Sequence, residues 1–297
     1  MREIGKIVAY SLAVVIGGAL LAPPLWWLGQ WLIASGWVPA LSPFGFSKYF
    51  NRAVLLVALA LLWPFARWLG LRHWQDLSLQ PNPRRFLDLA LGFGVGALGL
   101  GLAGLCLLLC EQVTYSAWRW DKVSGALLTG AVVAAIEEIF FRGALFGVLR
   151  RRLDWRWALA FLSVFFAVLH FIKPDRRVGP ITDVTWLSGF ALLPHSFWQF
   201  ANPALVLAGW STLVVVGWVL GYTVVRTCSL YMAIGLHAGW VFALRSFTSI
   251  TKRKAPASIW AGRDLTRGLL PLGLLLLTWG FVAWYLRRRE AAANVAK

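Results

Sequence analysis

The chain has 297 residues, of which 59% are hydrophobic and 14% are charged, and its formal net charge is +17. A soluble domain of this size has about half apolar and about a quarter charged residues, so the composition excludes an ordinary soluble protein and predicts a polytopic membrane protein. The positive charge does not indicate a nucleic-acid partner. The basic residues cluster at the ends of apolar runs, at 150–156, 252–254 and 287–290, as in membrane loops and anchors, so the expected partners include membrane lipids.

A membrane-spanning helix needs about 20 mostly apolar residues, and eight apolar segments have approximately this length. We expect spans at 8–34, 53–71, 87–110, 124–149, 155–172, 203–225, 229–246 and 268–286. The first has a basic start like a signal peptide, but its apolar stretch continues through "LWWLGQWLI" without a clean cleavage site, so we interpret it as uncleaved. The sequence therefore predicts an all-α polytopic membrane protein: a single domain over 1–297, with a motif-bearing core at about 124–246.

The links between the spans are short or basic, with one exception. The longest, 173–202, contains the apolar stretch "VTWLSGFALLPHSFWQF" and is expected to lie at the membrane interface or dip back into it. With eight spans both termini lie on one side, which collects 15 Lys and Arg residues against 13 on the other, although the basic loop 245–267 argues for the opposite orientation. We predict a plasma (inner) membrane location with both termini cytoplasmic.

Three charges lie inside the fourth span, in the stretch "AVVAAIEEIFFRG" at 131–143. Each ionised residue at the centre of a span costs roughly 2.5–3.5 kcal/mol, so these groups must pair, face a wet cavity or be protonated. Glu138 and Arg142 have the i,i+4 spacing, with the acid first, that favours an ion pair. Glu137 points about 100° away around the helix and is the better candidate for a general base. The alternative, a structural network in which both glutamates share Arg142, stays open.

Two histidines are expected at a similar depth in other spans. At 1.5 Å per residue, Glu137 and His170 lie about 20 and 22 Å from the loop that joins their spans, and His237 lies roughly 16 Å past Arg226. Three residues with catalytic side chains therefore converge from three helices. His73 and His195 fall in links and are expected at the surface. The three cysteines, in or next to apolar segments without metal-binding spacing, are expected to be packing residues rather than disulfides.

The motifs that carry these residues resemble those of a known family. "EEIFFR" fits the pattern EExxxR, "FAVLH" fits FxxxH, and "GLHAGW" supplies the later histidine. In this order they are similar to the CAAX protease and bacteriocin-processing (Abi) family, which includes the type II CAAX prenyl endopeptidases. The resemblance implies an intramembrane glutamic endopeptidase in which Glu137 activates the attacking water, His170 helps to hold it, and His237 stabilises the oxyanion. Four further residues are expected to support this site: Glu138, Arg142, Phe166 and Trp240.

The resemblance also implies a peptide or protein substrate with a hydrophobic or lipidated tail, and no cofactor. One position departs from the family, whose third motif is usually HxxxN or HxxxD. The residue four after His237 is Val241, which cannot donate a hydrogen bond. Either a neighbour such as Trp240 or Ser246 supplies the donor, His237 acts alone, or the site is impaired.

Two alternatives remain. Glu137, His170 and His237 are plausible zinc ligands, although no HExxH motif occurs and Arg142 disfavours a nearby divalent cation. A non-catalytic peptide-binding or immunity protein is the other alternative, which Val241 favours. A proton-coupled transporter is less favoured because no internal repeat is apparent.

Overall fold

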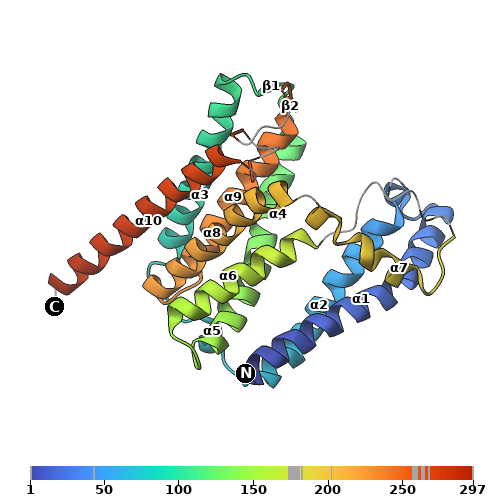
Figure 1. Cartoon of the computed structure of the whole chain (residues 1–297), viewed down its shortest axis with the longest axis horizontal. Helices are drawn as coiled ribbons and strands as arrows, with labels where there is room; N and C mark the ends of the chain where they lie inside the picture. The colour runs from blue at the N-terminus through green and yellow to red at the C-terminus, as the bar shows by residue number, and fades with distance from the viewer. Residues whose placement is uncertain are drawn as a thin grey trace. The chain divides into compact units, whose positions relative to one another are not determined.

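The structure, a computed structural model, describes residues 2–42, 44–172, 181, 183–201, 203–255, 260–261, 265–266 and 268–295. Figure 1 shows that the described chain is built almost wholly of helices. Five of the helices are long and apolar enough to cross a membrane, and α6 is a shorter apolar helix. The all-α polytopic membrane fold predicted from the sequence is therefore confirmed.

Each predicted span corresponds to a helix or to a continuous helical run. These are α1 (Arg2–Ala34), α2 (Phe46–Trp68), α3 (Arg85–Leu109), the run α4 (Trp120–Glu138), η3 (Ile139–Leu145) and α5 (Phe146–Leu149), then α6 (Trp155–Phe171), α8 (Pro203–Thr227), α9 (Tyr231–Ile250) and α10 (Leu269–Val295). Short elements lie between them: η1 (Pro39–Leu41), η2 (Trp74–Leu77), β1 (Val113–Tyr115), α7 (Ser188–His195), η4 (Trp198–Ala201) and β2 (Thr251–Arg253). Several helices extend past their apolar windows, because a helix continues into the polar zone that a hydropathy pattern does not detect.

The helices group into two compact units. The single domain expected from the sequence stays a prediction. The first unit comprises residues 1–72 and 170–203. In it α1 packs on α2, and a small core includes Ala22, Phe46 and Phe50. Helix α7, formed by part of the apolar link, packs closely on α1: an added methyl on Gly189 would overlap the backbone of Ala19. In this link, as expected, His195 is exposed.

The second unit comprises residues 73–169 and 204–297. Its central helix is α9, which packs on both α3 and α4 (Figure 1). Leu220 of α8, Trp240 of α9 and Leu275 of α10 belong to one buried apolar cluster. His73, at the start of this unit, is exposed as expected.

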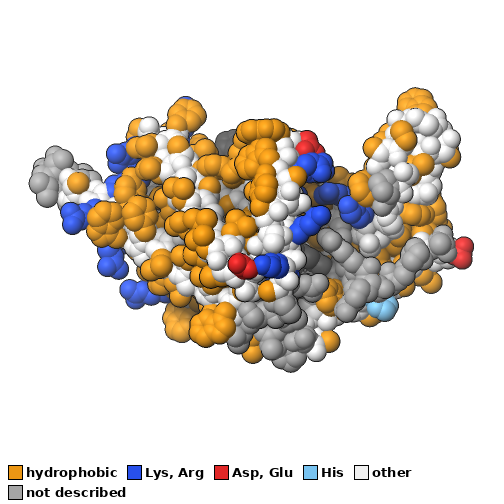
Figure 2. Space-filling model, turned by 90° about the horizontal axis from the view of Figure 1, so that it is seen from above, with side chains coloured by type: hydrophobic (Ala, Val, Ile, Leu, Met, Phe, Trp, Pro, Cys, Tyr) orange, Lys and Arg blue, Asp and Glu red, His pale blue; other side chains and the backbone are white. Residues whose placement is uncertain are grey.

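The outer surface is strongly apolar, as a lipid-facing surface must be. Figure 2 shows hydrophobic side chains over much of the face in view, with Lys and Arg side chains in separate groups. Large apolar side chains that are about half or more exposed include Leu98 and Leu105 of α3 and Leu277 of α10. Such continuous exposure is unusual for a soluble monomer, and it agrees with a chain surrounded by lipid.

Candidate active site

A buried polar triad lies where α4 passes into η3 and meets α9. Arg142 donates a hydrogen bond from Nη1 to Oε1 of Glu138 over 2.9 Å. Nδ1 of His237 lies 2.7 Å from the same oxygen. The exposed fractions are 0% for Glu138, 1% for Arg142 and 6% for His237. The ion pair predicted from the i,i+4 spacing is confirmed, and Glu138 also binds the histidine, which the spacing did not predict.

Arg142 joins three helical segments through its remaining contacts. Its Nη2 donates to the backbone oxygen of Gly217 in α8 over 3.2 Å. Its guanidinium carbon lies 4.6 Å from the centre of the Phe166 ring of α6, and that ring lies 6.4 Å from the imidazole of His237. A planar cation that combines an ion pair, a carbonyl contact and an aromatic face is the role to which arginine is suited. Arg142 and Phe166 therefore hold the helices around the triad.

The segment that carries Arg142 is a π-helix, over Ile139–Leu145, and its last five residues are buried. Such wide turns inside α-helices occur frequently at functional sites. Gly143 allows the π-helix to pack closely on η2. A methyl group at this position would lie only 2.9 Å from the backbone oxygen of Leu77. The sequence did not predict the π-helix, since its residues are ordinary apolar helix residues apart from Arg142 and Gly143.

Glu137 differs from its neighbour in accessibility and direction. Its side chain is 27% exposed, whereas that of Glu138 is 0% exposed. Oε2 of Glu137 lies 3.9 Å from Nε2 of His237. The imidazole therefore has a carboxylate on each side, one within hydrogen-bond distance and one farther away than a direct hydrogen bond allows.

This arrangement orients the imidazole ring of His237. Oε1 of Glu138 accepts a hydrogen bond from Arg142. Nδ1 of His237 lies against the same carboxylate oxygen, which leaves Nε2 of the ring on the Glu137 side. A carboxylate that orients a histidine in this way is a recurring arrangement in hydrolytic sites.

His170 is the penultimate residue of α6 and is half-buried. It follows Phe166 by four residues, so the two share one face of the helix. His170 belongs to the first unit and the triad to the second, and its part in the site stays a prediction.

The residues expected to compensate for Val241 have different surroundings. Trp240 packs in the apolar cluster with Leu220 and Leu275, and its predicted role as a donor stays a prediction. The hydroxyl of Ser246 is buried and has no hydrogen-bond partner in the described part of the chain. Nine residues separate Ser246 from His237, about 13 Å along the helix axis, so Ser246 is too distant to replace a side chain at 241.

In the part of the chain that the structure describes, no three His, Cys, Asp or Glu side chains are grouped so as to hold a metal ion. The three cysteines are free thiols: Cys106 is half-buried, and Cys110 and Cys228 are exposed.

The comparisons with known proteins agree with this geometry. No curated protein and no solved structure matches the chain. One family model matches, over residues 119–243. This segment runs from the start of α4 into α9 and contains all three motifs. The resemblance predicted from these motifs is thereby confirmed: residues 119–243 match the protease family described as type II CAAX prenyl endopeptidase, Rce1-like.

Proposed function

We propose that the chain is an intramembrane glutamic endopeptidase that hydrolyses a peptide bond near the membrane end of a hydrophobic or lipidated peptide or protein tail. The observation that carries this proposal is the position of His237 between two unequal carboxylates. Glu138 is buried and bound to Arg142, whereas Glu137 is partly accessible and faces the other nitrogen of the ring. One carboxylate orients the imidazole, and the other lies on the partly exposed side of the ring.

In this mechanism Glu137 accepts a proton from a water molecule, and the oxygen of that water attacks the carbonyl carbon of the substrate. His170, one helical turn beyond Phe166, holds and polarises the water. The protonated Nε2 of His237 stabilises the negative charge that develops on the carbonyl oxygen, a large effect in a site with little water. When the carbon–nitrogen bond breaks, the departing amine takes the proton that Glu137 had accepted, and the acyl part of the substrate leaves with a new carboxyl terminus.

The mechanism uses no metal, and the alternative is a zinc protease in which Glu137, His170 and His237 are the ligands. Elemental analysis of the purified full chain, together with cleavage assays before and after treatment with a chelator, separates the two. We expect full activity after chelation. Stoichiometric zinc, with activity lost on chelation and restored by zinc, would instead establish the metal mechanism.

The adjacent glutamates provide a matched pair of variants for the test of the proposal. The assay uses a fluorescence-quenched peptide with an isoprenylated cysteine three residues from its end, and a peptide of the same sequence with an unmodified apolar tail. Glu137→Gln keeps the side-chain shape but removes the base, so we expect cleavage to fall by about 10²-fold or more with little change in thermal unfolding. Glu138→Gln leaves Arg142 buried without its counter-charge and should destabilise the fold by about 3–5 kcal/mol.

Wild-type cleavage by the folded Glu137→Gln protein would refute the peptidase proposal. The competing function is a non-catalytic peptide-binding or immunity protein. The observation that favours it is Val241, an apolar side chain one turn after His237 where the family motif usually has a donor. Stable binding of the reporter peptide by the wild-type chain, without cleavage, would support that function.

A further inference from the structure

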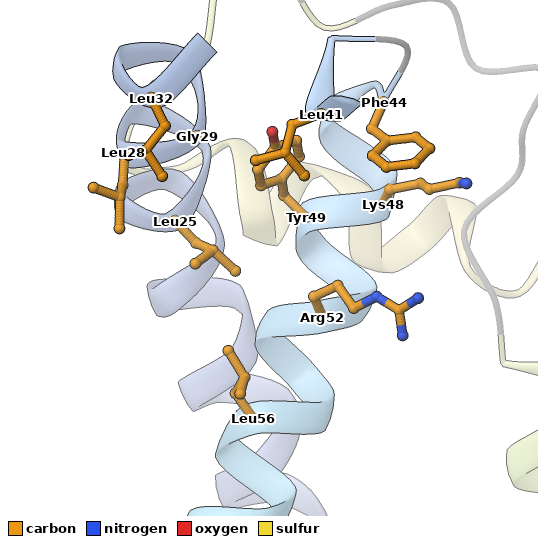
Figure 3. Close-up of a pocket in the computed structure, with 10 residues that line it drawn as sticks. All are labelled: Leu25, Leu28, Gly29, Leu32, Leu41, Phe44, Lys48, Tyr49, Arg52 and Leu56. Atoms are coloured by element: carbon orange, nitrogen blue, oxygen red, sulfur yellow. The ribbon is translucent and has the colours of Figure 1, made fainter. Parts of the chain in front are cut away.

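A cavity in the first unit combines apolar walls with two cations. It has a volume of about 300 Å³ and lies along α1 and α2, at the lower end of the range of about 300–1,000 Å³ that is typical of small-molecule sites. Leu25 and Leu28 of α1 and Leu56 of α2 are among its apolar lining residues, and Lys48 and Arg52 of α2 are its charged ones. Figure 3 shows the two cations one turn apart on α2, with both side chains directed in this view to the side of the helix away from α1.

The two cations form no ion pair with any residue that the structure describes. None of the ion pairs among the described residues includes Lys48 or Arg52. The ammonium group of Lys48 instead lies 4.0 Å from the centre of the Phe44 ring, which also lines the cavity. Two like charges one turn apart repel each other, so an anion between them would remove an unfavourable interaction.

A buried hydroxyl provides a second, independent indication of a ligand. Tyr49 lines the cavity, is 7% exposed, and its hydroxyl has no hydrogen-bond partner among the residues that the structure describes. Figure 3 shows this hydroxyl beside Leu41, on the side of α2 that faces α1. A buried polar group without a partner is costly, and a ligand with an acceptor oxygen would satisfy it.

The polarity of the cavity changes along the span. Lys48, Tyr49 and Arg52 lie in the first two turns of α2, where the helix begins, whereas Leu56 lies one turn farther in. On α1, Leu25 likewise lies deeper than Leu32, which is near the end of that helix. The polar end of the cavity therefore lies at the membrane boundary and its apolar end lies toward the hydrocarbon, as in an amphiphile.

We propose that this cavity binds one anionic phospholipid, with its phosphate at Lys48 and Arg52, an oxygen of the headgroup region at the Tyr49 hydroxyl, and an acyl chain along the leucines. Basic pockets between membrane helices are suited to such headgroups. A zwitterionic lipid of the same chain length carries a compensating cation and gains less from the two basic side chains. The site lies in the first unit, whereas Glu137 and His237 are in the second, and it does not depend on the peptidase proposal.

The test measures lipid retained by the full-length protein, without an activity assay. The chain is reconstituted with phosphatidylglycerol and phosphatidylcholine of identical acyl chains, extracted into mild detergent, and examined by native mass spectrometry. We expect one phosphatidylglycerol per chain to be retained in preference to phosphatidylcholine. Each basic side chain contributes about fivefold to binding of an anionic lipid, so the Lys48→Gln/Arg52→Gln double variant should bind about twentyfold more weakly.

Two further variants make the test specific. Arg67→Gln removes an equivalent exposed charge from the same helix, outside the cavity, and should leave retention unchanged. Tyr49→Phe should weaken retention severalfold without lowering the unfolding temperature, because its hydroxyl has no protein partner to lose. Equal retention of the two lipids by the wild type, or equal losses in the double variant and Arg67→Gln, would overturn the proposal. Displacement of the lipid by inorganic phosphate would do so as well, because it would identify free phosphate as the ligand.

Discussion

At the scale of single residues, the oxygen of Glu138 that two partners share determines how the site can work. Arg142 and His237 both bind Oε1 of this carboxylate. Because Nδ1 of His237 lies against Glu138, Nε2 of the ring faces Glu137. A ring nitrogen without a hydrogen can only accept, so the proposed stabilisation of an oxyanion requires a proton on Nε2 during the reaction.

A donor at position 241 should assist this histidine. Val241 lies one turn after His237 on α9 and is half-buried. Removal of a single oxyanion donor costs about 10²–10³ in rate in other hydrolases, so we expect Val241→Asn to raise kcat by about tenfold or more, with little change in KM. Val241→Leu, which adds bulk without a donor, should not raise it. Steady-state kinetics with the reporter peptide check both, and an unchanged or lower kcat in Val241→Asn would show that His237 needs no donor from this position.

At the scale of secondary-structure elements, glycines bring α9 close to α3. Gly92 and Gly96 of α3 meet the backbone of α9 around Leu236, and Gly235 and Gly239 of α9 meet the backbone of α3 in return. Added methyl groups at these positions would overlap backbone atoms, so the helices approach as in the small-residue packing common in membranes. His237 lies between the two glycines of α9, about 200° around the helix from Gly235. The tight contact with α3 therefore presents the histidine on the opposite face, where it reaches Glu138.

This packing predicts different effects for two glycines on the same helix. At Gly96 a methyl group would overlap the backbone oxygen of Leu236, whereas at Gly94 nothing lies within 4 Å. Gly96→Ala should therefore lower the free energy of unfolding by about 1–3 kcal/mol and reduce cleavage, because Leu236 directly precedes His237. Gly94→Ala should leave stability unchanged or slightly raised. Thermal unfolding in detergent, measured alongside cleavage, distinguishes the two, and equal melting temperatures would contradict the proposed packing.

The same elements show how far the sequence allowed prediction. All eight helical segments were predicted, because a bilayer requires long apolar helices and their composition shows it. The Glu138–Arg142 pair was predicted because both residues lie on one helix with known geometry. The bond from Glu138 to His237 was not, since counting residues gives the depth of a side chain in the membrane but not its rotation about the helix axis. The π-helix was missed because no residue type specifies it, and the contact of Gly143 with η2 depends on tertiary packing.

At the scale of the whole molecule, hydrogen bonds join the helices or strands of the second unit at each of its two ends. At one end Arg289 of α10 donates to Asp88 of α3 over 2.7 Å. Asn82 there donates to Asp88 over 2.9 Å and to Ser229, just before α9, over 3.3 Å. At the other end β1 follows α3, β2 follows α9, and the two strands pair antiparallel. The carboxyl-terminal half of α10 therefore lies at the end where α8 leads into α9.

Two native cysteines mark these ends and provide a direct test of orientation. Cys228 lies between α8 and α9, at the end that holds Asp88, and Cys110 follows α3 at the end of the paired strands; both are exposed. With the termini cytoplasmic, an impermeant maleimide added to intact spheroplasts should label Cys110, and it should label Cys228 only after the membrane is permeabilised. Cys110→Ser and Cys228→Ser variants assign each signal, while half-buried Cys106 should react with neither treatment. The reverse labelling pattern would place the carboxyl terminus outside, and the basic loop between α9 and α10 would then be the cytoplasmic one.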